Sequence, residues 1–178
     1  MAVAQFVREL LDSNEYVLFG ALDGLTVEDL HRQPASDSNP IGWLMWHLSR
    51  IQDRIVSVMQ GKDEEWISGG WYEKFGRDRD PADRGRGQTS EEVAAFRAPD
   101  VATLISYYKD VRTHMNAFLD ALLDADLERP VPRPGRSSTG ETVPLAERLY
   151  DLVRDNVQHT GQIAYLRGLF RGNGWLDL

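Results

Sequence analysis

Residues 39–60 read NPIGWLMWHLSRIQDRIVSVMQ, and this stretch decides the fold class. Asn39 followed by Pro40 is typical of a helix N-cap and a first-position proline, and Gly61 is typical of a helix end. Between them, apolar residues recur at helical spacing: Ile41, Leu44, Met45, Leu48, Ile51, Ile55, Val58 and Met59. The pattern predicts a helix over about residues 40–60 with one buried side, and His47 lies on that side.

Three further stretches show the same helical period: residues 3–22, 101–124 and 142–171. No strong strand pattern is evident, and residues 129–140, with three prolines and two glycines, predict a loop. Four long helices joined by loops predict an all-α fold, a four-helix bundle, formed as a single domain over residues 1–178.

The connection between the second and third long helices includes an unusual stretch, residues 62–88. It contains two of the five tryptophans, the pair Gly69-Gly70 and a charge-dense run over residues 77–86. Long loops of this kind are typically functional or mobile. The aromatic half is therefore a candidate cover for a pocket, and the charged half predicts a solvated surface loop. The length of the connection also permits an up-up-down-down order of the helices.

Composition and charge restrict the function. The chain of 178 residues has a net charge of −8 and no cysteine, which excludes disulfides, thiolate metal sites and cysteine nucleophiles. The acidic balance argues against a nucleic-acid partner or an anionic membrane surface. Charges at Arg8, Glu9 and Asp12 interrupt any signal-peptide core, and no apolar run approaches the roughly 20 residues that span a bilayer. We therefore expect a cytoplasmic protein without a nucleic-acid or membrane partner.

Two residues of the last predicted helix point to a reactive site. Asp155 and His159 are four residues apart and share a helix face with Leu152 and Ile163. A carboxylate on the apolar face of a bundle helix is costly unless it is protonated, paired with a cation or bound to a metal. An aspartate and a histidine at this spacing can reach the same ion.

His47 lies on the apolar side of the second long helix, and bundle cores build metal sites from side chains on facing helices. His47, Asp155 and His159 together predict a three-ligand set for a divalent metal ion, with positions left for water or substrate. Two simpler interpretations stay open: a hydrogen-bonded core histidine at position 47, and a surface ion pair between Asp155 and His159. We expect His114 at the boundary of the core and His31 at the surface.

Two segments resemble the DinB/YfiT-like family. Residues 39–48, NPIGWLMWHL, resemble its second-helix motif, and residues 155–168, DNVQHTGQIAYLRG, resemble its fourth-helix motif. The resemblance implies an up-up-down-down bundle, often dimeric, in which His47, Asp155 and His159 hold a divalent ion such as zinc, nickel, iron or manganese. Asp155 stands where many relatives have histidine. Its oxygen donors favour harder ions, so the identity of the metal stays open.

The resemblance also implies a metal-dependent enzyme that acts on a small-molecule substrate, as a transferase for low-molecular-weight thiols or a related hydrolase or isomerase. Since the chain has no cysteine, the thiol must come from a cosubstrate. Gln162, three residues after His159, is a candidate outer-shell group that orients a ligand. The alternative is a non-catalytic protein in which the metal supports the fold or a homodimer.

Other side chains have both a functional and a structural interpretation. Trp43, Trp46 and Trp71 are candidates for a pocket wall, although ordinary core packing is the preferred interpretation for Trp46. Arg154 and Arg167 are candidates for binding an acidic substrate, although solvated helix faces explain them more simply.

Overall fold

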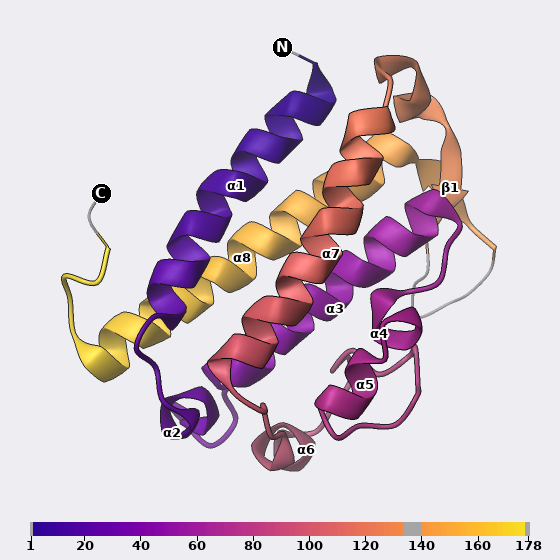
Figure 1. The fold of residues 1–178 in the computed structure, drawn as a ribbon. Coiled ribbons are helices and arrows are strands. Elements are labelled where there is room, and N and C mark those ends of the chain that lie inside the picture. The colour runs from indigo at the N-terminus through magenta and orange to yellow at the C-terminus, as the bar shows by residue number, and fades with distance from the viewer. Residues whose placement is uncertain (1, 134–139, 177–178) are drawn as a thin grey trace.

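Four long helices lie side by side in the computed structural model, which describes residues 2–133 and 140–176 (Figure 1). They are α1 (Val3–Leu22), α3 (Ile41–Gln60), α7 (Val101–Ala121) and α8 (Leu145–Arg171). The predicted all-α four-helix bundle is confirmed, and the helix bounds agree closely with the apolar periods. Within the described ranges, no helix combines the length and apolarity that crossing a bilayer requires.

The order of the helices along the chain is up-down-down-up, whereas the family resemblance implies up-up-down-down (Figure 1). Helices α1 and α8 run in the same direction, and α3 and α7 run in the opposite one (Figure 1). The core reflects this: Val7 and Leu149 share one apolar cluster, and Leu18 and Leu166 share the other. The long connection from α3 to α7 returns the chain to the starting end, which makes these two helices parallel.

Short elements connect the long helices: α2 (Val27–His31), α4 (Glu65–Ser68), α5 (Trp71–Lys74), α6 (Ser90–Ala95), η1 (Asp124–Glu128), β1 (Pro130–Pro132) and β2 (Thr142–Pro144). Thr26 and Thr89 form capping boxes at the starts of α2 and α6. The proline-rich loop contains β1, which pairs with β2 through the buried side chains of Val131 and Val143. Residues 134–139 of the predicted loop lie outside the described residues.

The aromatic half of residues 62–88 is not an open loop but forms α4 and α5. Trp66, Trp71 and Phe75 are buried there, and all three rings pack against Tyr107 of α7. Burying three large rings offsets the cost of ordering the segment. The aromatic half therefore extends the core.

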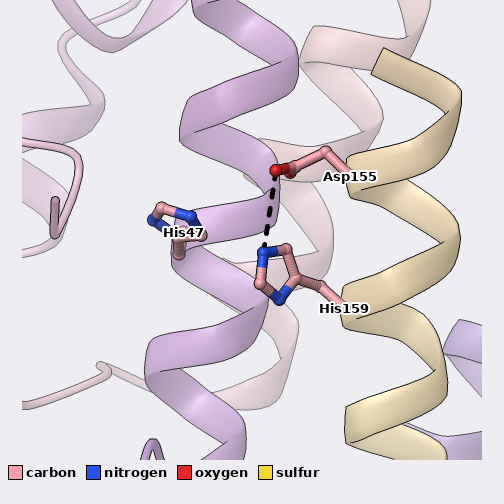
Figure 2. A group of neighbouring side chains, drawn as sticks. All are labelled: His47, Asp155 and His159. Carbon is pink, nitrogen blue, oxygen red and sulfur yellow. Dashed lines mark ion pairs between the residues drawn. The ribbon is translucent and has the colours of Figure 1, made fainter. Parts of the chain in front are cut away.

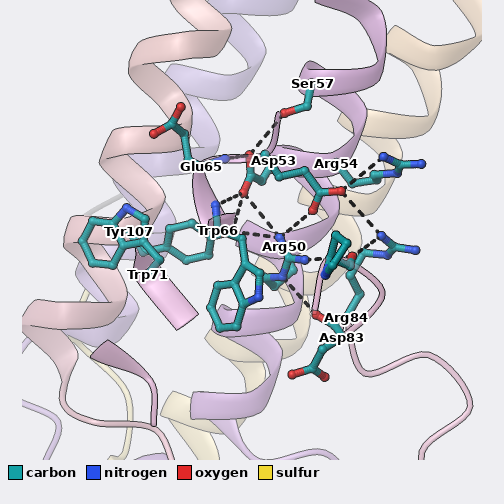
Figure 3. A network of polar contacts seen from close by, with 12 residues as sticks. Arg50, Asp53, Arg54, Ser57, Glu65, Trp66, Trp71, Asp83, Arg84 and Tyr107 are labelled. Carbon is teal, nitrogen blue, oxygen red and sulfur yellow. Dashed lines mark hydrogen bonds and ion pairs between the residues drawn. The ribbon is translucent and has the colours of Figure 1, made fainter. Parts of the chain in front are cut away.

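A buried ionic network fastens this connection to α3 (Figure 3). The Asp53 carboxylate accepts hydrogen bonds from the backbone amides of Glu65 and Trp66, and from the Tyr107 hydroxyl at 2.7 Å. Arg50, which is fully buried, donates to the Glu64 carboxylate at 2.8 Å. The same guanidinium donates to the backbone carbonyls of residues 81 and 83. One side chain of α3 therefore holds both halves of the connection.

Polar side chains between α1 and α8 set the rotation of α8 about its axis. Asn14 of α1 donates to the side chains of Asn156 and Thr160, the latter at 2.8 Å, and both α8 residues are buried. Asp155 and His159 each precede one of these residues. Because consecutive side chains of a helix are about 100° apart, this contact turns Asp155 and His159 toward α3.

Candidate metal centre

The structure brings the three predicted ligands together. His47 lies on α3, whereas Asp155 and His159 lie one turn apart on α8, and the three side chains point toward one another across the gap between these helices (Figure 2). One potential ligand atom from each residue lies within 4.8 Å of the other two. The group could therefore hold a metal ion.

The ring of His47 is held in one tautomer. Its Nδ1 faces the backbone carbonyl of Arg84, and because a carbonyl only accepts, Nδ1 carries the proton. The ring stacks on Trp43 with centroids 4.7 Å apart, and the Trp43 indole donates to Gln88 Oε1 at 2.7 Å. The second ring nitrogen, Nε2, therefore carries no proton, and its lone pair is available to a metal ion.

His159 is oriented in the same way by a different partner. Its Nδ1 donates to Gln162 Oε1 at 2.7 Å, as expected for the outer-shell group that the sequence predicts. Its Nε2 lies 3.7 Å from Asp155 Oδ2, and its ring meets the His47 ring edge to face at 5.0 Å. Both imidazoles therefore keep Nδ1 occupied, which leaves Nε2 available to an ion.

Asp155 supplies an observation that favours a cation at this place. Its Oδ1 is buried and has no hydrogen-bond partner within the described parts of the chain. Burial raises the pKa of the Asp155 carboxyl, and the nearby His159 opposes that shift. A buried carboxylate oxygen without a partner is costly, and a metal ion removes that cost. One oxygen and two imidazole nitrogens form a donor set that suits divalent transition ions.

The other predicted site residues lie elsewhere. Trp46 is buried in the core, as expected, and Trp71 donates to Asp110 on α7, so only Trp43 among the three tryptophans contacts the ligand group. His114 is half-exposed beside Glu65, with its Nε2 3.3 Å from Oε1.

Two expected surface residues also have structural contacts. His31 is only partly exposed, and its Nε2 accepts a hydrogen bond from the Ala98 amide at 2.9 Å. Arg154 pairs with Asp151 at 3.3 Å, and its side chain is mostly exposed.

Sequence reasoning missed the segment that completes the site. The charged half of residues 62–88 is not simply solvated, because the carbonyl of Arg84 contacts His47. The available signal was Gly85, whose φ of +77° favours glycine and where a Cβ atom would overlap the Trp43 ring. A glycine inside a charged run therefore marks the place where the backbone crosses the aromatic side of the site.

Comparison with known proteins places this arrangement in a family. The pattern of the DinB superfamily matches residues 10–163, which include all three ligand candidates. The chain belongs to the DinB superfamily. A crystal structure of a conserved protein from Enterococcus faecalis is similar to this DinB chain, with a TM-score of 0.84 and 28% identity. The similarity covers 97% of this chain and 99% of that one. A comparison with curated proteins found no match.

The site of this DinB chain predicts a pH dependence of stability. Burial lowers the pKa of His47 to about 4, and the contact with the Arg84 carbonyl opposes part of that shift. The unfolded chain, with an ordinary histidine pKa of about 6.5, therefore binds the proton first as the pH falls. We expect His47 to reduce the free energy of unfolding of the metal-free protein by about 3 kcal/mol between pH 6.5 and 4.

Chemical denaturation of the wild type and His47→Gln across this pH range measures the effect. The difference between the two proteins isolates the contribution of His47, since the raised pKa of Asp155, which acts in the opposite direction, is present in both. A difference that does not change with pH would contradict the assignment.

Proposed function

We propose that His47, Asp155 and His159 bind one divalent metal ion, and that the chain is a metal-dependent enzyme that acts on a small-molecule substrate. The supporting observation is that one ligand atom from each of the three residues lies within 4.8 Å of the other two, while both Nδ1 atoms are already engaged. In addition, Asp155 Oδ1 is buried without a hydrogen-bond partner among the described residues. A pair of core histidines without an ion would leave Asp155 Oδ1 buried without a partner. Zinc, nickel, iron and manganese all accept this donor set.

The arrangement is that of a reactive site. A divalent ion with three protein ligands keeps a position for substrate and lowers the pKa of a thiol or a water there. The chain itself orients both imidazoles through the contacts of their Nδ1 atoms, and places the Trp43 ring against His47 as one wall. Because the chain has no cysteine, any thiol must come from a cosubstrate. Transfer of a low-molecular-weight thiol, or related hydrolysis or isomerisation, follows as the proposed chemistry.

Gln162 offers a test that leaves the ligands in place. We expect Gln162→Leu to weaken zinc binding about 10–100-fold, because His159 loses the partner that fixes its Nδ1 proton. Competition with a chromophoric chelator measures the affinity. Gln158→Leu is the matched control, since Gln158 is exposed on the same helix. Equal affinity in the wild type and Gln162→Leu would contradict the orienting role.

The proposed chemistry is tested with metal-loaded protein, a panel of low-molecular-weight thiols and a chromogenic electrophile such as 1-chloro-2,4-dinitrobenzene. We expect thioether formation above the uncatalysed rate, its loss on adding a chelator, and its loss in Asp155→Asn. A second panel of ester substrates tests hydrolysis. Metal binding that raises the melting temperature without turnover on either panel would support the alternative, a non-catalytic metal-binding protein. Homodimer formation and a cytoplasmic location stay predictions.

A further inference from the structure

Arginines gather around the proposed metal site, although the whole chain has a net charge of −8. On α8, Asp151 lies one turn before Asp155, and its carboxylate forms ion pairs with three of these arginines. Arg148 is 2.7 Å from its carboxylate, Arg154 is 3.3 Å away and Arg133 is 3.7 Å away. Arg133 has a second carboxylate partner in Glu147. Two carboxylates therefore face three guanidinium groups next to the site.

Arg148 is the most enclosed member of this group. It is 7% exposed, and its Nε is buried without a hydrogen-bond partner within the described residues. Burial lowers the pKa of Arg148 and the contact with Asp151 opposes that shift, whereas the nearby arginines Arg133 and Arg86 lower the pKa further by repulsion. A buried guanidinium with an unused donor and like-charged neighbours is in a position that favours an anion.

Arg86 approaches the same place from the segment that crosses the site. Its charge is close enough to His47, Arg84, Arg148 and Asp155 to influence the pKa of each. Its side chain is exposed, and no ion pair or hydrogen bond of it occurs in residues 2–133 and 140–176. Arg84, two residues earlier, already lies 3.6 Å from Glu64. Within the described part of the chain, Arg86 therefore has no ion-pair partner.

We propose that Arg86 and Arg148 bind an anionic oxygen group, a carboxylate or a phosphate, of the small-molecule substrate while its reacting atom lies beside His47, Asp155 and His159. This inference rests on the proposed function. The charge of Asp155 attracts Arg86, but a divalent ion bound at the site would take up that negative charge. The positive charge of Arg86 then has no partner among residues 2–133 and 140–176, and the local excess of positive charge attracts an anion.

The experiment compares three small thiols in calorimetric titrations of the zinc-loaded full chain: 3-mercaptopropionate, 2-mercaptoethyl phosphate and the neutral 3-mercaptopropionamide. We expect at least one anionic thiol to bind about tenfold more tightly than the amide, the size of one charge-assisted hydrogen bond. Whichever of the two anionic thiols binds more tightly identifies whether the site prefers a carboxylate or a phosphate. In Arg86→Gln this preference should fall to about twofold or less, whereas Arg86→Lys should retain most of it.

Arg97→Gln is the control, because Arg97 is exposed and, within the described residues, donates to the backbone carbonyls of Ala94 and Phe96 at the end of α6. It removes the same charge and should keep the preference. Zinc content is measured for every variant, so that loss of metal is not mistaken for loss of anion binding. Equal affinity of the wild type for all three thiols, or an unchanged preference in Arg86→Gln, would overturn this inference alone. Zinc-loaded protein that binds none of the thiols would overturn the proposed thiol chemistry and this inference together.

Discussion

Replacing Arg50 with methionine is expected to lower the free energy of unfolding by about 3–5 kcal/mol, the usual cost of leaving a buried charge without its partner. Arg50 is fully buried, and its guanidinium lies 2.8 Å from Glu64 and 3.4 Å from Asp53. Without Arg50, both buried carboxylates lose their nearest cation. The backbone carbonyls of residues 81 and 83 also lose a donor, so the segment over His47 should loosen.

Urea denaturation of the metal-free protein measures this effect. The matched control is Arg54→Met, because Arg54 pairs with the same Glu64 carboxylate at 3.2 Å but its side chain is 35% exposed. Partly exposed pairs contribute about 1 kcal/mol or less. A loss in Arg50→Met no greater than that in Arg54→Met would show that the network does not fasten the connection to α3.

Asp155→Asn is expected to reduce zinc affinity by at least about 100-fold, because removing an outer-shell partner already costs about 10–100-fold and this variant removes a ligand. The metal-free variant should be as stable as the wild type or slightly more stable. Asparagine keeps the shape of the side chain and removes a charge that burial disfavours. A simple ion pair between Asp155 and His159 predicts the opposite, a loss of stability in the metal-free protein.

The variant is examined by a chelator competition assay and a thermal melt with and without zinc. The melting temperature of the wild type should rise with zinc, by mass action on the folded state, and that of Asp155→Asn should not. Asp120→Asn is the control for removing a carboxylate, since Asp120 pairs only with the partly exposed Arg8. Unchanged zinc affinity in Asp155→Asn would remove Asp155 from the ligand set.

The long helices and the ligand group could be predicted because their signals are local. Apolar residues at helical spacing give the bounds of α1, α3 and α8, and capping residues such as Thr26 and Thr89 mark helix starts. Asp155 and His159 are informative because their spacing puts both on one apolar face. Predicting His47 as the third ligand required the additional expectation that α3 faces α8, and the four-helix bundle provides that expectation.

What could not be predicted depends on contacts between distant parts of the chain. The carbonyl of Arg84 contacts His47 in a segment that Arg50 of α3 holds through the backbone carbonyls of residues 81 and 83. A charge-dense run has no apolar period that would reveal this packing. The order of the helices could not be predicted either. The long connection from α3 to α7 shows that the helices need not simply alternate, but it does not distinguish up-up-down-down from up-down-down-up.

A crystal structure of the zinc-loaded protein with an anomalous difference map at the zinc edge tests the central claim most directly. We expect one peak between α3 and α8, roughly 2.0–2.2 Å from Nε2 of His47, Nε2 of His159 and a carboxylate oxygen of Asp155. The Nδ1 atoms should keep their contacts with the Arg84 carbonyl and Gln162. Absence of a peak there, or a peak held by other groups such as His114 and Glu65, would contradict the proposed metal centre.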